Sequence, residues 1–269
     1  MSAARRRHRR LRVGVLVSGS GTNLQSILDA CARGTIGAEV AVVLSNRPEA
    51  PALDRARGAG VPAIVVRHQD FPDRTLFDAR LVEVLREHRV DLVCLAGFMR
   101  LLTPGFVRAF PGRILNIHPA LLPAFPGLDV QEKAVAHGVR FSGCTVHLVD
   151  EGCDTGPIVI QAVVPLAPGD RARELAARIL EQEHRIYPRA IQLFAEGRIR
   201  VEPGTRMVRV RGAGFDGRAL VNPPLPDEER PRSATKRGDA KRGVTKRVIT
   251  RRGVTKRAAP AGKKKTRKR

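Results

Sequence analysis

The sequence predicts an α/β protein with a Rossmann-like, mostly parallel sheet, helices on both faces and mixed edge strands in its second half. Three observations predict this fold. Short β-rich runs alternate with segments of helical apolar spacing through the first hundred residues. A glycine-rich loop, SGSGTN at 18–23, separates the first such strand from the first such helix. Two later β-branched runs, at 143–149 and 158–164, follow each other without a helix between them, which favours antiparallel pairing.

Each strand is expected where Val, Ile and Leu cluster, and each helix where apolar residues recur three or four positions apart. In the first half, strands at 11–17, 40–44, 61–66 and 91–96 alternate with helices at 24–32, 53–59 and 76–88. The second half adds a strand at 113–117, a helix at 131–136, the two strands above, and a helix at 173–196 that Pro188 should kink or divide. A small hairpin is expected at 206–221, around the glycines at 212–217.

The formal charge of +23 is concentrated at the ends of the chain. Residues 1–12 and 232–269 hold 23 of the 49 Lys and Arg residues but one of the 26 Asp and Glu residues, so the part between them is nearly neutral. From Lys236 to Arg257 a basic pair recurs every five residues, a period that fits neither helix nor strand. We therefore expect a disordered basic arm at 1–11, one folded domain at 12–203, an extension with a Pro-rich linker at 204–231, and a disordered basic tail at 232–269.

Cysteine usage and hydropathy indicate a cytoplasmic protein. The four cysteines are scattered and form no CxxC pair, which is typical of reduced thiols. No apolar run approaches the roughly 18 to 20 residues that span a bilayer, and the Arg-rich start lacks the apolar region of a signal peptide. The sequence therefore predicts neither export nor contact with a membrane.

The loop SGSGTN is a candidate anion site, because backbone amides and the dipole of the following helix favour a phosphate there. Dinucleotide binding is the obvious rival, but Leu24 stands where GxGxxG requires its third glycine. The lysine of a Walker loop is also missing. A plain tight turn that caps the helix remains the other interpretation.

Asn116 and His118 form the clearest candidate catalytic pair. They alternate onto one face of a strand at its carboxyl end, which packing alone explains poorly. A histidine satisfied by the backbone is the alternative for His118. Asp154, in GCDTGP, caps a turn in one interpretation and reaches His118 in the other, where it would favour the charged imidazolium. The remaining histidines show no spacing suited to a metal, and we expect none.

These residues belong to motifs that resemble the phosphoribosylglycinamide formyltransferases, folate-dependent enzymes of purine biosynthesis. The resemblance covers about 12–202. Its motifs are VSGSGTNLQ at 17–25, SNRPEA at 45–50, LAGFMRLL at 95–102, NIHPALLPAFPG at 116–127, GCTVHLVDEGCDTGPIVIQ at 143–161 and EQEHRIYP at 181–188. The chain departs from the family near Asp129, where a histidine is common, and in its basic tail, which has no counterpart there.

The resemblance implies a role for each motif. Gly21, Thr22 and Asn23 would hold the phosphate of the ribonucleotide, and Glu183 would lie on the side of its amine. Asn116, His118 and Asp154 would be catalytic. The co-substrate would be 10-formyltetrahydrofolate, without a metal. Its site would be formed by Arg74, Met99, Arg100, Leu101, Leu102 and Asn116, although packing alone would also explain the apolar run at 98–102.

Three rival functions remain. A formyltetrahydrofolate hydrolase shares the Asn, His, Asp chemistry but normally has a regulatory domain upstream, for which the residues before Arg12 leave no room. A tRNA formyltransferase lacks this phosphate loop and has a folded C-terminal domain. A nucleic-acid-binding protein would act through the tail at 232–269, whose attraction to polyanions would be non-specific and sensitive to salt.

Overall fold

The computed structural model describes residues 9–214 and 220. Its strands are β1 (Leu11–Val17), β2 (Ala38–Ser45), β3 (Ala63–Val65), β4 (Leu92–Leu95), β5 (Ile114–His118), β6 (Phe141–Leu148), β7 (Ile158–Pro165), β8 (Ile199–Val201) and β9 (Val208–Val210). Its helices are α1 (Thr22–Ala32), α2 (Ala52–Gly58), α3 (Arg74–Glu87), α4 (Pro104–Ala109), α5 (Val130–Ala136) and α6 (Ala172–Ala195), with a 3₁₀ turn η1 (His68–Asp70). No helix in this part of the chain is long and apolar enough to cross a membrane.

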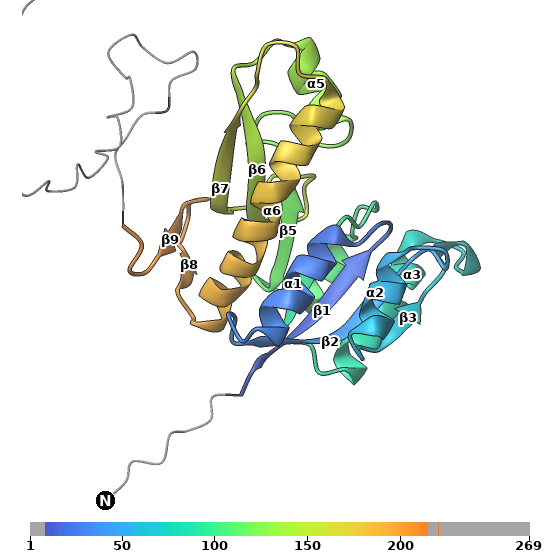
Figure 1. The fold of residues 1–269 in the computed structure, drawn as a ribbon. Helices are drawn as coiled ribbons and strands as arrows, with labels where there is room; N and C mark the ends of the chain where they lie inside the picture. The colour runs from blue at the N-terminus through green and yellow to red at the C-terminus, as the bar shows by residue number, and fades with distance from the viewer. Residues whose placement is uncertain (1–8, 215–219, 221–269) are drawn as a thin grey trace, which may run out of the picture. The chain divides into compact units, whose positions relative to one another are not determined.

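The central sheet has seven strands in the order β3-β2-β1-β4-β5-β6-β7. The pairs from β3 to β5 are parallel, and β6 and β7 are antiparallel to their neighbours. Figure 1 shows α6 running beside α1 and along β6. The predicted fold class, a mostly parallel sheet with mixed edge strands, is therefore confirmed. The disorder expected in the tail at 232–269 lies outside the described residues, as does that of the arm except for residues 9–11.

Side chains of β1 alternate between two hydrophobic cores, one on each face of the sheet. Val13 and Val15 join a cluster with α1, α2, α5 and α6, whereas Leu16 joins a cluster with α3 and α4. A Cβ on Gly14 would lie 2.5 Å from Leu85 of α3. The glycine thus allows α3 to approach the strand closely. Both faces are buried, which explains why β1 is an almost continuous apolar run in the sequence.

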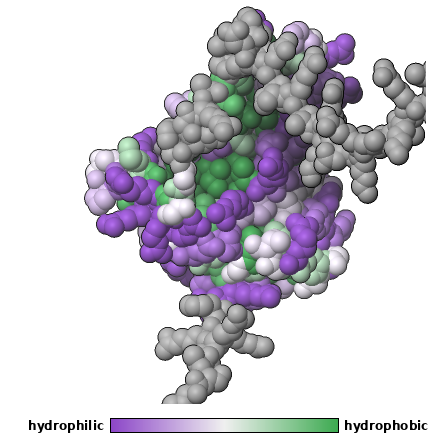
Figure 2. Space-filling view, turned by 60° about the vertical axis from the view of Figure 1, so that its left-hand side comes forward, coloured by the Kyte–Doolittle hydropathy of each residue, from purple (hydrophilic) through white to green (hydrophobic). Residues whose placement is uncertain are grey.

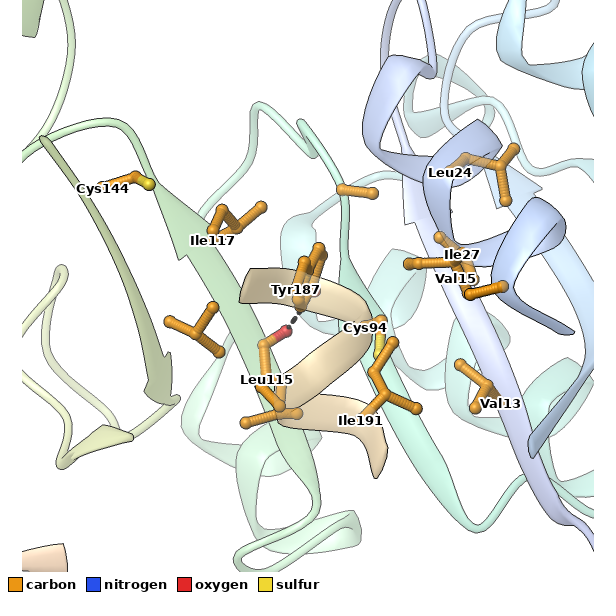
Figure 3. Packing of buried hydrophobic residues seen from close by; sticks show 14 of the residues in the cluster. Val13, Val15, Leu24, Ile27, Cys94, Leu115, Ile117, Cys144, Tyr187 and Ile191 are labelled. Atoms are coloured by element: carbon orange, nitrogen blue, oxygen red, sulfur yellow. Dashed lines mark hydrogen bonds between the residues drawn. The ribbon is translucent and has the colours of Figure 1, made fainter. Parts of the chain in front are cut away.

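Helix α6 is continuous through Pro188, so the division that the sequence allowed there is wrong, whereas the kink stays a prediction. Its neighbour Tyr187 is fully buried. The Tyr187 hydroxyl lies 3.0 Å from the carbonyl oxygen of Leu115 (Figure 3) and 3.0 Å from that of Leu95. An interior proline costs about 3 kcal/mol in lost hydrogen bonding and steric conflict. Packing of the apolar face of α6 against the sheet outweighs that cost.

Two local features differ from the sequence prediction. Helix α4 was missed, although Thr103 caps it and Pro104 stands at its first turn, a recognisable start signal. The hairpin expected at 206–221 was misplaced, because β8 pairs with β9 across a turn at 202–207. Pro203 and Gly204, which has φ 72°, match the middle positions of a type II turn. This turn fixes the register, and residues 215–219 lie outside the described part.

We expect Tyr187→Phe to lower the free energy of unfolding by about 1 to 2 kcal/mol, because two buried carbonyl groups lose a shared donor. Urea titration measures the change. Ser20→Ala, which removes an exposed hydroxyl, is the control and should change the free energy of unfolding by less than about 0.5 kcal/mol. Equal stability of Tyr187→Phe and the parent would contradict an anchoring role for the hydroxyl.

Candidate active site

The carboxyl ends of three parallel strands meet at one edge of the sheet. Leu16 of β1 pairs with Leu95 of β4, and Leu95 pairs with Asn116 of β5. The segments that follow these strands therefore begin next to one another. They are the part of the glycine-rich loop that precedes α1, at 18–21, an irregular segment at 96–103 and a longer one at 119–129. In open α/β sheets this edge is where ligands bind.

The structure brings Asn116, His118 and Asp154 together. Asn116 and His118 lie two residues apart on β5, while Ile117 between them faces the core. Asp154 comes from the segment between β6 and β7. Its carboxylate accepts a 3.4 Å hydrogen bond from Asn116 Nδ2 and lies 3.4 Å from His118 Nδ1. The turn-capping alternative for Asp154 is not what the structure shows, because the carboxylate points to these side chains.

The backbone around Asp154 is tightly held. Asp154 itself has a φ of 54°, a conformation that an L-residue adopts only when its surroundings impose it. The Asp150 carboxylate accepts hydrogen bonds from the Gly152 amide and the Thr155 hydroxyl, at 3.1 and 2.6 Å. A Cβ on Gly156 would lie 1.7 Å from the Leu148 carbonyl oxygen, so only glycine fits there. These constraints direct the Asp154 side chain towards β5.

His147 is a member of this cluster that the sequence analysis missed. Its Nε2 lies 3.1 Å from Asn116 Nδ2 and 3.6 Å from the Asp154 carboxylate, and its Nδ1 lies 3.0 Å from the Leu148 carbonyl oxygen. The ring is almost fully buried. His147 stands opposite Asn116 in the antiparallel pair β5–β6. The register of that pair was the missing signal.

The His118 ring faces hydrogen-bond acceptors on both sides. Its Nε2 lies 2.9 Å from the Phe125 carbonyl oxygen, and its Nδ1 faces Asp154. A carbonyl oxygen and an ionised carboxylate can only accept, so the doubly protonated ring satisfies both. The interpretation of His118 as a backbone-satisfied histidine therefore describes one of its two nitrogens.

The Asp154 carboxyl is strongly acidic. Burial raises its pKa, but hydrogen bonding by His147, the 2.9 Å hydrogen bond from the Gly127 amide and the charges of His118 and His147 together lower the pKa to about 2. The group is therefore ionised at neutral pH. A negative charge beneath Asn116 and His118 can hold their hydrogen-bond donors in place.

The glycine-rich loop opens directly into a helix. Gly21 has φ 72°, and a Cβ there would lie 2.5 Å from Ala52 Cβ. Helix α1 begins at Thr22, two residues before the predicted start. Asn23 Nδ2 donates a 2.7 Å hydrogen bond to Glu183, while Asn23 Oδ1 is buried without a hydrogen-bond partner among the described residues. Thr22 and Asn23 thus occupy the helix terminus expected to attract an anion.

Glu183 lies on α6, next to the glycine-rich loop, and is 6% exposed. Burial raises the pKa of its carboxyl, and the hydrogen bond from Asn23 partly offsets that effect. The structure therefore joins two residues that the sequence places 160 positions apart. The carboxylate and amide form one polar group beside the start of α1.

Apart from Asn116 on β5, the residues expected at a folate site lie on α3 and on the segment at 96–103. Met99 and Leu101 are 64% and 58% exposed, so their apolar surfaces are accessible to a ligand. Leu102 is partly buried against the hydrophobic core that contains α3 and α4. The Arg100 guanidinium lies over the Phe77 ring at 5.2 Å, and Arg74 is the exposed first residue of α3. Within the described residues, no cluster of His, Cys, Asp and Glu could hold a metal ion.

A family model described as formyl transferase matches residues 11–191. The chain belongs to the formyl transferase family. It is 44% identical to phosphoribosylglycinamide formyltransferase of Haemophilus influenzae over 78% of this chain and 95% of that protein. The Escherichia coli enzyme of the same name is 42% identical over 71% of this chain and 90% of its own length. This family member is thus an enzyme of the phosphoribosylglycinamide formyltransferase type.

Solved formyltransferase structures share the fold. Glycinamide ribonucleotide transformylase 1 from Symbiobacterium toebii superposes with a TM-score of 0.73 at 57% identity, over 75% of this chain and 94% of that one. The family also occurs inside larger proteins. A trifunctional purine biosynthetic protein of Drosophila melanogaster is 49% identical over 72% of this chain, which spans 15% of that protein. Figure 2 shows a hydrophobic area near the centre of one face of the molecule, with hydrophilic side chains around much of it.

Acid should weaken the folded protein through Asp154. Its pKa is lowered from 3.8 to about 2 on folding, so the stabilisation is present above pH 3.8 and is lost as the pH falls towards 2. We expect the difference in unfolding free energy between the parent and Asp154→Asn to shrink by about 2 kcal/mol from pH 5 to pH 2. Denaturant titrations at stepped pH measure it. Parallel curves for the two proteins would contradict this account.

Proposed function

We propose that this formyltransferase moves the formyl group of 10-formyltetrahydrofolate to the amine of 5-phosphoribosylglycinamide, a step of purine biosynthesis. One observation carries the proposal. The ionised Asp154 holds the Asn116 amide and the His118 imidazole side by side at the carboxyl end of β5. The glycine-rich loop begins at the same edge of the sheet. Amide and imidazolium donors suit an oxyanion, and the loop suits the phosphate of the amine substrate. The names of the relatives agree with the amine substrate and with transfer of a formyl group.

The amine substrate would bind at the start of α1. Gly21, Thr22 and Asn23 would hold its phosphate through backbone amides and the positive end of the helix dipole. The unpartnered Asn23 Oδ1 and the adjacent Glu183 offer acceptors for the donor groups of the ribose or glycinamide. Because Glu183 is buried, its carboxyl group needs a hydrogen-bond partner, and a donor group of the substrate would supply one.

The formyl donor would bind along 99–102. The exposed apolar surfaces of Met99 and Leu101, with Leu102, would cover its flat ring system. Arg100 and Arg74 would face its acidic tail, where a guanidinium pairs well with a carboxylate. Asn116 would contact the donor at the formyl group. Attack by the amine would then occur above β5.

The chain's own groups would act on charge and protons. As the amine nitrogen bonds to the formyl carbon, the carbonyl oxygen becomes an oxyanion in a tetrahedral intermediate. Asn116 Nδ2 and the His118 imidazolium would donate hydrogen bonds to it. The His118 Nε2 proton is held by the Phe125 carbonyl oxygen, which the oxyanion would replace as acceptor. Asp154 would keep His118 charged and orient a water that moves the amine proton to the departing folate nitrogen.

The rival hydrolase reaction uses the same donor but needs only water. The two reactions are separated by mixing the protein with 10-formyltetrahydrofolate, with and without 5-phosphoribosylglycinamide, and following tetrahydrofolate release. We expect release that depends on the amine. Release at the same rate without the amine would favour the hydrolase.

Replacing His118 by Ala should lower turnover about 100- to 1000-fold, the loss typical of one oxyanion donor, with the fold intact. His88→Ala is the matched control. His88 follows α3 near the amino ends of β1 and β4, whereas the candidate site lies at the carboxyl ends of the strands. Steady-state turnover and circular dichroism measure both effects. An active His118→Ala variant would refute the mechanism.

Deletion of 232–269 should leave turnover unchanged and reduce retention on immobilised nucleic acid at low salt. The reason is the non-specific attraction of a basic segment to polyanions, which salt screens. Turnover assays and salt-gradient elution test the two effects separately. Lost turnover would show that the tail serves the active site. The cytoplasmic location and the domain boundaries stay predictions.

A further inference from the structure

The segment at 96–103 has no helix or strand, yet it carries the side chains proposed to cover the formyl donor. Its backbone is held at both ends by buried polar side chains. At the far end, Asp78 of α3 accepts a 2.6 Å hydrogen bond from the Thr103 amide. At the near end, Ser18 contacts the segment twice. Its amide donates to the Gly97 carbonyl oxygen at 3.1 Å, and its Oγ accepts from the Met99 amide at 2.9 Å.

The direction of the Ser18 hydroxyl is fixed by a third group. Ser18 Oγ donates its proton to Asn46 Oδ1 at 2.6 Å, which leaves the oxygen lone pairs for the Met99 amide. Ser18 and Asn46 are both 4% exposed. Water therefore cannot easily replace the hydroxyl if it is removed. The Met99 amide would be left without an acceptor.

The rest of the glycine-rich loop is held by different contacts. The Gly19 carbonyl oxygen accepts a hydrogen bond from the Ala52 amide at 3.2 Å, and the Ser20 carbonyl oxygen accepts one from Arg55 at 2.8 Å. Gly21 packs against Ala52. None of these contacts uses the Ser18 hydroxyl. Removing it should release the segment at 96–103 and leave the loop around Gly21 in place.

We propose that Ser18 is a positioning residue for the formyl donor, although it opens the loop that would bind the phosphate of the other substrate. Its hydroxyl fixes the Met99 backbone and so presents Met99 and Leu101 to the donor. The loop thus divides between the two substrates, with Ser18 acting on the donor side and residues 21–23 on the acceptor side. This assignment rests on the proposed formyl transfer.

Two-substrate kinetics of Ser18→Ala test the proposal. We expect the KM for 10-formyltetrahydrofolate to rise about tenfold, because an unpaired buried amide loosens the segment. The KM for 5-phosphoribosylglycinamide should change less than about twofold, since the loop keeps its other contacts. Ser20→Ala, at the exposed serine two positions along, is the matched control and should leave the donor KM unchanged.

Hydrogen exchange adds a readout that does not depend on turnover. The Met99 amide should exchange faster in Ser18→Ala than in the parent or in Ser20→Ala, while amides of α1 keep their rates.

Two results would overturn the role of Ser18. One is an unchanged donor KM in a variant whose parent transfers formyl groups. The other is an equal rise of both KM values, which a general loss of structure would produce. A parent protein that transfers no formyl group in the presence of both substrates would instead refute the proposed function itself.

Discussion

The half-buried carboxylate of Asp154 is the group on which the arrangement of the candidate active site depends. A charge removed from water is costly unless it is paired and hydrogen-bonded. Here the partners come from three parts of the chain. They are His118 and Asn116 on β5, His147 on β6, and the Gly127 amide from the segment at 119–129. The need to satisfy one anion therefore holds two strands and two irregular segments in fixed relation.

Three of the four non-glycine residues with positive φ in the described part of the chain lie in the segments around the same carboxylate, and the fourth, Arg89, follows α3. Phe125, Asp129 and Asp154 are non-glycine residues with φ between 51° and 55°. Phe125 presents its carbonyl oxygen to His118, and Asp154 presents its carboxylate. Such conformations persist only where the surroundings over-determine them, and they are common at functional sites. The sheet beneath supplies that support, because both its faces are covered by packed helices.

Local patterns in the sequence were sufficient for the strands of the central sheet, most helices and the fold class. They also predicted that Asn116 and His118 lie side by side, because two polar side chains at alternate positions of one strand share a face. His147 could not be identified in this way, since its place opposite Asn116 depends on the register between β5 and β6. The link between Asn23 and Glu183 is equally non-local. The hairpin was misplaced because several glycine-containing turns compete there, and only pairing selects one.

Helix α6 joins the core to the acceptor side of the site. Glu183 and Tyr187 lie four residues apart and so share one face of the helix. Tyr187 is fixed between β4 and β5 by its contacts with Leu95 and Leu115, and Glu183 reaches Asn23 one turn earlier. A rotation or shift of the helix that accommodates a new core residue would also move the carboxylate. During evolution, core packing beneath α6 and the proposed recognition of the amine substrate by Glu183 are therefore expected to change together.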